Sequence, residues 1–236
     1  MIEFLFLDLD NTILDFDRAE STALEKALAT VGITADKEVA ALYSRINKRH
    51  WQMLERREIT RDALRVNRFR VLFQELGVEA DPAAMAQEYE KQLSAGCFFL
   101  PGAEEAVARL SRKYRLYIAS NGNAHVQHGR MTGANLYRFF EKVFISQEVG
   151  ADKPSPEFFR RSFAQIPDFD PRRALLVGDS LSSDIQGGRN AGIATCWINP
   201  GHAPAKDNIV PDYQLDSLTQ LEALLETLQG NQPEVQ

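Results

Sequence analysis

The chain has 236 residues, of which 44% are hydrophobic and 25% are charged, and its net charge is -6. These proportions are ordinary for a globular protein and exclude a disordered, collagen-like or disulfide-rich chain. The acidic balance and the lack of an apolar stretch of about 18 residues argue against a nucleic acid polymer and a membrane as partners. Cys97 and Cys196 lie far apart, and no targeting segment is recognised, so we expect reduced thiols and a cytoplasmic location.

The first predicted element is a short buried strand that ends in two carboxylates. Residues 4–12 read FLFLDLDNT, an apolar run followed by Asp8, Asp10 and Thr12. Such runs are typical of strands buried on both faces of an α/β sheet, and Asp is unfavourable inside a strand. We therefore expect Asp8 and Asp10 at the carboxyl end of the strand, where open α/β sheets bind ligands. Taken alone, the same residues also fit a turn in which an Asp caps the next helix.

The next segment, residues 16–96, carries helical patterns and no clear strand. Apolar residues recur at helical spacing, as at Leu24, Ala27, Leu28 and Val31, which is typical of amphipathic helices. We predict a helical domain inserted after the first strand. Nine basic residues against three acidic ones lie between positions 45 and 70. One or two of them are expected to face an anionic substrate, and the others to be solvated.

Beyond the insertion, strands alternate with helices. Further apolar runs, each bounded by turn residues, cover residues 115–120, 143–146, 174–179 and 193–198, with helical patterns between them. This alternation predicts a doubly wound, mostly parallel, Rossmann-like α/β sheet. The predicted domains are an α/β core of residues 1–15 and 97–228, a helical cap domain of residues 16–96, and a frayed C-terminal tail of residues 229–236.

Four strand ends carry polar side chains that would meet at one edge of a parallel sheet. The residues are Asp8, Asp10 and Thr12, then Ser120, Asn121 and Gly122, then Lys153, and finally Asp179 and Asp184. Taken singly, each of these elements would be an ordinary loop. Together, several carboxylates in one pocket would raise one another's pKa unless a cation lay among them. Oxygen ligands without His or Cys suit Mg2+, with Lys153 as a further positive charge.

In this order the four elements resemble the motifs of the haloacid dehalogenase superfamily of phosphohydrolases, and a helical cap of the C1 type after the first strand fits as well. The resemblance implies that Asp8 is the nucleophile that becomes an aspartyl phosphate. It implies that Asp10 protonates the departing ester oxygen and later deprotonates the attacking water.

The same resemblance assigns the binding residues. The substrate would be bound by Thr12, Ser120, Asn121, Gly122 and Lys153, with Asn121 acting through its main chain. Mg2+ would be bound by Asp8, the main-chain carbonyl of Asp10, and Asp179, with Asp184 ligating through water or orienting Lys153.

The residues at the strand ends also bear on the type of reaction. Dehalogenase members of the superfamily lack an acid at the position of Asp10, so its presence favours phosphoryl chemistry. A sugar phosphomutase remains open, because it uses the same two aspartates and differs in excluding water through cap closure. A non-catalytic binding protein is a third hypothesis, which the loss of Asp8, Asp10 or Asp179 would have supported.

A finer resemblance concerns the substrate. Residues 145–154 and 177–199 resemble the pyrimidine 5'-nucleotidase branch, which removes phosphate from nucleoside monophosphates. Asn123 departs from the aromatic residue expected after the Asn-Gly pair, which leaves phosphoglycolate and sugar phosphates open as substrates. We expect a small-molecule phosphate ester as the partner, and a monomer or homodimer.

Overall fold

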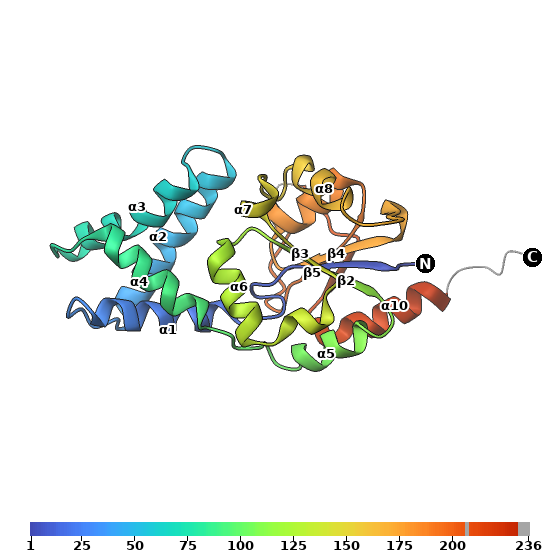
Figure 1. Cartoon of the computed structure of the whole chain (residues 1–236), viewed down its shortest axis with the longest axis horizontal. Helices are drawn as coiled ribbons and strands as arrows, with labels where there is room; N and C mark the ends of the chain where they lie inside the picture. Colours follow the sequence, from blue (N-terminus) through green and yellow to red (C-terminus); the bar gives the residue numbers. More distant parts are fainter. Residues whose placement is uncertain (206–207, 231–236) are drawn as a thin grey trace, which may run out of the picture. The chain divides into compact units, whose positions relative to one another are not determined.

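The computed structural model describes residues 1–205 and 208–230 of the chain (Figure 1). The chain divides into two compact units, one formed by Met1–Phe16 with Cys97–Gln236, the other by Asp17–Gly96. Within the described residues, no helix is long and apolar enough to cross a membrane.

The first unit is built on a six-stranded sheet in which every pairing is parallel. The strands are β1 (Phe4–Leu7), β2 (Arg115–Ser120), β3 (Lys142–Ile145), β4 (Ala174–Gly178), β5 (Ala194–Ile198) and β6 (Tyr213–Leu215). Their order across the sheet is β3-β2-β1-β4-β5-β6. The strand order reverses at β1, which lies between β2 and β4, and this is where sheets of this kind bind ligands.

Helices cover both faces of this sheet (Figure 1). The α-helices of the first unit after residue 97 are α5 (Ala103–Leu110), α6 (Ala124–Gly133), α7 (Ser146–Val149), α8 (Pro156–Phe163), α9 (Gln186–Ala191) and α10 (Leu221–Gly230). Short helical turns are η1 (Leu136–Phe139), η2 (Pro171–Arg173), η3 (Leu181–Ile185) and η4 (Leu218–Gln220).

Alternate residues of the strands pack against different helices. Leu5 and Leu7 of β1 lie in one hydrophobic cluster with residues of α5 and α10, such as Val107. Phe4 and Phe6 lie in a second cluster with α8. Because successive side chains of a strand point to opposite faces, an unbroken apolar run buries both faces of the sheet. The predicted doubly wound α/β fold is therefore confirmed.

The second unit is helical. Its helices are α1 (Phe16–Ala29), α2 (Lys37–Glu55), α3 (Arg61–Leu76) and α4 (Pro82–Ser94), the first of which begins on the last residue of the first unit. Asp36, Thr60 and Asp81 cap the last three helices by accepting hydrogen bonds from main-chain N–H groups of the first turn. The sequence thus marks where each of these helices begins.

An aromatic cluster and a buried polar chain hold the helices of this unit together. Tyr43, Phe69 and Tyr89 pack with ring centroids 5.3 to 5.4 Å apart. Beside them, Arg68 donates to Oδ1 of Asn47 at 2.9 Å, and Asn47 donates to Glu20 at 2.6 Å. Arg68 is one of the nine basic residues for which a solvated or substrate-facing position was expected. It is instead only 5% exposed, and its guanidinium lies 4.8 Å from the ring centroid of Tyr89.

Two details differ from the sequence-based expectation. Strand β6 has no counterpart in it, because three residues at a sheet edge are too short to show a pattern. Helix α10 continues to Gly230, so the first two residues of the expected frayed tail are helical. The rest of that expected tail, residues 231–236, lies outside the described residues.

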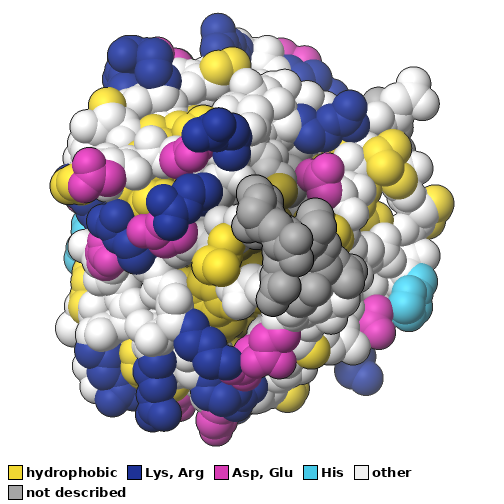
Figure 2. All heavy atoms as spheres, turned by 90° about the vertical axis from the view of Figure 1, so that its right-hand side faces the viewer, with side chains coloured by type: hydrophobic (Ala, Val, Ile, Leu, Met, Phe, Trp, Pro, Cys, Tyr) yellow, Lys and Arg dark blue, Asp and Glu magenta, His cyan; other side chains and the backbone are white. Residues whose placement is uncertain are grey.

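The charged surface is mixed in sign. Figure 2 shows Lys and Arg side chains interspersed with Asp and Glu over one face of the molecule. Exposed ion pairs include Arg109 with Glu222 at 2.8 Å and Lys113 with Glu226 at 3.0 Å. Exposed ion pairs of this kind contribute little to the stability of the fold.

Candidate active site

The candidate site lies at the carboxyl ends of the central strands β1 and β4. Asp8 follows β1 directly, and its N–H donates to the carbonyl of Val177 on β4 at 2.9 Å. The hydrogen bonding of the sheet thus reaches the first carboxylate residue. Asp179 follows Gly178, the last residue of β4. Because neighbouring parallel strands end at the same edge, two Asp residues from distant segments come together here.

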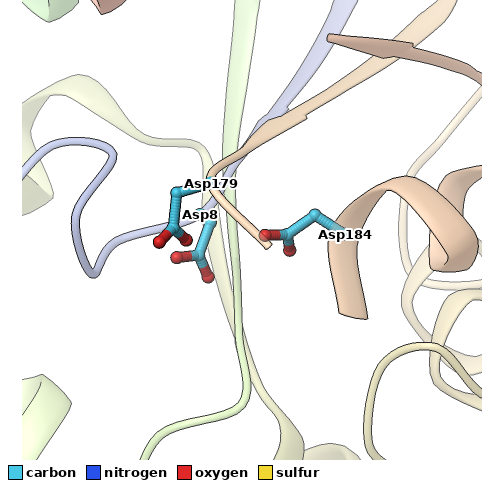
Figure 3. A group of neighbouring side chains, drawn as sticks. All are labelled: Asp8, Asp179 and Asp184. Carbon is cyan, nitrogen blue, oxygen red and sulfur yellow. The ribbon is translucent and has the colours of Figure 1, made fainter. Parts of the chain in front are cut away.

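Three carboxylates gather at this edge, from Asp8, Asp179 and Asp184 (Figure 3). One oxygen atom from each lies within 4.8 Å of the others. Asp184, on the π-helical turn η3, is fully buried, and its Oδ2 accepts a hydrogen bond from the N–H of Ser180 at 3.1 Å. Gly178 leaves room for it, since a Cβ atom there would lie 2.2 Å from Oδ2 of Asp184.

Lys153 joins this carboxylate group from the loop before α8. Its Nζ atom donates to Oδ1 of Asp8 at 2.7 Å and to Oδ1 of Asp184 at 2.6 Å. It also donates to the main-chain carbonyl of Ala119 on β2. The side chain is 1% exposed, so a charged amine that would be costly to bury alone is paired with two carboxylates.

The electrostatics of the site favour a further cation. Burial raises the pKa of Asp8 to about 7 against the opposing effect of Lys153, and Asp184 and Asp10 raise it further. Burial and then Asp8 raise the pKa of Asp179 well above its usual range. Burial opposes the charge of Lys153, but Asp184 and Asp8 together raise its pKa. One amine against three carboxylates leaves an excess of negative charge, and a donor set made only of oxygen fits a hard divalent cation.

The carboxylate of Asp10 makes different contacts. Its Oδ2 accepts a hydrogen bond from Nε2 of Gln127 at 2.8 Å, and its Oδ1 accepts one from Arg130. Nε2 of Gln127 also donates to Oγ of Ser120 at 2.8 Å. The expected metal contact of Asp10 concerned its main-chain carbonyl and stays a prediction.

Gln127 and Arg130 were not among the predicted site residues. The only signal in the sequence is their spacing of three on the helix after the Ser-Asn-Gly turn, which puts both on one face of α6. Their partner Asp10 lies 117 and 120 positions away, so nothing local indicates the contact.

The remaining predicted residues lie in and near the turn after β2 and in the loop after β1. Ser120 is buried, and its Oγ accepts a hydrogen bond from the N–H of Gly122 at 3.1 Å. Thr12 is buried too, and its hydroxyl has no hydrogen-bond partner among the described residues. Asn123, the departure from the expected aromatic, caps α6 by accepting from the N–H of Val126 at 3.2 Å. An aromatic residue could not make this contact.

Comparison with known proteins now identifies the family. The family model described as haloacid dehalogenase-like hydrolase matches residues 5–198. The chain is 38% identical to the HAD-hydrolase YfnB of Bacillus subtilis over 94% of both chains. It is 38% identical to the pyrimidine 5'-nucleotidase PynA of Streptococcus pneumoniae over 93% of both chains. The chain belongs to the haloacid dehalogenase-like hydrolase family and is an enzyme of that family.

Solved structures agree with this assignment. A crystal structure of YfnB from Bacillus subtilis, bound to magnesium, superimposes with a TM-score of 0.91 at 37% identity and covers 95% of this chain and 98% of its own. A 2-haloacid dehalogenase from Pseudomonas syringae gives a TM-score of 0.67 at 24% identity, covering 97% and 100%. The second likeness concerns the fold alone.

Proposed function

We propose that the chain is a Mg2+-dependent phosphomonoesterase that works through an aspartyl phosphate on Asp8. The observation that carries this proposal is the contact of Asp8 with Lys153, inside a group of three carboxylates of which Asp8 and Asp184 are buried. A nucleophilic carboxylate that attacks a phosphate dianion needs positive charge close by, and Lys153 supplies it. Asp10 supplies the proton that an alkoxide leaving group requires.

The proposed reaction has two chemical steps. One oxygen of Asp8 attacks phosphorus, the bond from phosphorus to the ester oxygen breaks, and protonated Asp10 gives its proton to the departing oxygen. Ionised Asp10 then takes a proton from water as the water oxygen attacks the aspartyl phosphate. The bond between phosphorus and the Asp8 oxygen breaks, inorganic phosphate leaves, and Asp8 and Asp10 return to their starting states. Ser120 and the main chain of Asn121 would bind phosphoryl oxygens during both steps.

The carboxylate group is the proposed Mg2+ site. Asp8, Asp179 and the main-chain carbonyl of Asp10 would hold the ion, while Asp184 would ligate through water or orient Lys153. The 2.6 Å contact between Asp184 and Lys153 supports the orienting role. When bound, Mg2+ supplies charge neutralisation for the phosphoryl oxygens.

Relatives support a nucleotide as the substrate. PynA and the pyrimidine 5'-nucleotidase YjjG of Escherichia coli, which is 32% identical over 94% of this chain and 97% of its own, both carry that activity in their names. We therefore propose nucleoside 5'-monophosphates as substrates and the cytoplasm as the location. The glyceraldehyde 3-phosphate phosphatase of Pyrococcus furiosus, at 29% identity over 97% of this chain and 93% of its own, supports another small phosphate ester as the alternative.

The experiment is a phosphate-release screen over nucleoside monophosphates, sugar phosphates and phosphoglycolate, with Mg2+ and with a chelator. We expect the highest kcat/KM for pyrimidine nucleoside monophosphates, and no release in chelator or by the Asp8→Asn variant. Release that survives both changes would contradict the mechanism. Isomerisation of a sugar phosphate without release would indicate a phosphomutase, and binding without turnover a non-catalytic protein.

A further inference from the structure

Two buried polar side chains of α6 hold the carboxylate of Asp10 from both sides. Gln127 is 1% exposed and binds one oxygen of Asp10, while Arg130 is fully buried and binds the other. The side chain of Asp10 itself is 29% exposed. The partly accessible carboxylate of Asp10 is thus fixed by two buried side chains.

The amide of Gln127 is fully used. An amide nitrogen has two protons to donate, and Nε2 of Gln127 lies 2.8 Å from Oδ2 of Asp10 and 2.8 Å from Oγ of Ser120. This leaves the amide oxygen, which lies 3.3 Å from a guanidinium nitrogen of Arg130. The contacts therefore determine which way the amide is turned, and they link the Asp10 carboxylate to the turn after β2.

Gly122 leaves room for the side chain of Gln127. A Cβ atom at position 122 would lie 2.4 Å from Nε2 of Gln127 and 2.5 Å from its Cδ. Any other residue there would require the Gln127 side chain to shift. Because Gly122 has no side chain, it leaves space for the Gln127 side chain to reach Asp10.

Arg130 carries a charge into the interior. Its guanidinium lies 5.7 Å from the ring of Phe16 and forms an ion pair with Asp10. Burying an arginine is unfavourable unless carboxylates or other acceptors compensate it. A purely structural role would only join α6 to the loop after β1. Arg130 binds one oxygen of the Asp10 carboxylate and Gln127 binds the other, and together these contacts fix the direction in which the Asp10 side chain points.

We propose that Gln127 and Arg130 are positioning residues for Asp10, a role that rests on the proposed function. They limit the rotation of the Asp10 side chain, so that the carboxyl group is aligned with the leaving oxygen whenever a substrate binds. Alignment of a proton donor matters most when the leaving group is a poor one, since a good leaving group departs without a proton.

The test compares substrates with different leaving groups at saturating Mg2+. The Gln127→Leu, Arg130→Lys and Arg130→Met variants are assayed for kcat/KM on p-nitrophenyl phosphate and on an alkyl phosphate. The ratio kcat/KM reports the steps up to departure of the leaving group. We expect a loss of about tenfold to a hundredfold on the alkyl ester, with little loss on the aryl ester and partial retention in Arg130→Lys.

A matched control separates positioning from folding. Met131 is fully buried on the same helix and belongs to the apolar core, so Met131→Ala should lower the melting temperature without altering the ratio between the two substrates. In an Asp10→Asn background, Gln127→Leu should cause no further loss on the alkyl ester, because both changes act through one group.

Two results would overturn the proposal. Equal losses on both substrates would indicate a structural role, and so would effects that add to Asp10→Asn. A wild-type protein that releases no phosphate would instead overturn the proposed function, and with it the role of Asp10 that these residues serve. Gln127→Leu carries the test if the Arg130 variants do not fold.

Discussion

The side chain of Asn121 binds the main chain of Lys153 with two hydrogen bonds. Its Nδ2 donates to the Lys153 carbonyl at 2.8 Å, and its Oδ1 accepts from the Lys153 N–H at 2.8 Å. Asn121 follows β2, whereas Lys153 lies in the loop before α8, so the pair fastens the lysine loop to the sheet edge. The position of Lys153 is thus fixed both by hydrogen bonds from Asn121 to its main chain and by hydrogen bonds from its amine to the carboxylates of Asp8 and Asp184.

We expect the Asn121→Leu variant to lose both bonds while keeping a similar side-chain volume. Lys153 would then be less well fixed, and kcat should fall by about tenfold or more while stability falls by about 1–3 kcal/mol. The measurements are phosphate release and urea unfolding. Asn190→Ala is the control, because the exposed Asn190 donates to the Pro154 carbonyl on the same loop at 2.9 Å and should affect activity little.

Removing the lysine amine tests the charge balance of the site. In Lys153→Met, Asp8 and Asp184 lose their buried cation, so in chelator we expect a loss of about 3–5 kcal/mol in stability. Added Mg2+ should recover part of it, since it would bind among the same carboxylates. Thermal unfolding with and without Mg2+ measures both effects. The exposed Lys142, changed to Met, should leave stability within about 0.5 kcal/mol. A Lys153→Met protein as stable as wild type would contradict the charge argument.

The pKa of Asp8 predicts how pH and Mg2+ act together. Its value in the unfolded chain is near 3.8, and burial raises it to about 7 in the folded protein. Between these values the folded state keeps a proton that the unfolded state has released, so this group's contribution to stability in chelator falls as pH rises. Mg2+ must displace that proton below pH 7. The rise in melting temperature on adding Mg2+ should therefore be larger at about pH 8 than at about pH 5.5.

Asp8→Asn is the control for this pH effect. The amide does not titrate in this range, so the variant should show a smaller difference between the two pH values. If Mg2+ raises the melting temperature of the wild-type protein by the same amount at both pH values, the assignment of Asp8 to the metal site is contradicted.

Adding a single Cβ atom at Gly178 should affect the activity. In Gly178→Ala the new Cβ would lie 2.2 Å from Oδ2 of Asp184 and 2.3 Å from its Cγ, so Asp184 must move. Because Asp184 also binds Lys153, we expect kcat/KM to fall by about a hundredfold and Mg2+ affinity to weaken. Gly201→Ala is the control, since a Cβ there meets nothing within 4 Å. Equal activity of the two variants would show that Asp184 can shift without consequence.

The helical unit offers a prediction about stability. Arg68→Met would leave Asn47 and Glu20 without the charge that ends their buried chain, at an expected loss of about 2–4 kcal/mol. Arg70→Met on the same helix is the control, because Arg70 is exposed and should change stability by less than about 0.5 kcal/mol. Urea unfolding of both variants measures the difference, and similar midpoints would contradict a buried role for Arg68.

Local patterns in the sequence were sufficient for the fold and for the location of the polar strand ends. The apolar runs before Asp8 and Asp179 predicted buried parallel strands, because a strand covered on both faces must be apolar at every position. The family resemblance and the α/β fold are confirmed by the comparisons. The roles of the individual residues stay predictions, and β6 was missed because three edge residues carry too little pattern.

The tertiary structure alone decided which of these groups contact one another. The sequence did not show that the carboxylate of Asp10 contacts Gln127 and Arg130, whereas that of Asp8 contacts Lys153, 145 positions away. It could not show that the Asn121 side chain binds the lysine loop. The physical reason is that spacing along a strand or helix determines which face a side chain occupies, whereas its partner depends on how distant segments pack. The sequence determined which functional groups lie at the sheet edge, and the packing of distant segments determined which partner each carboxylate contacts.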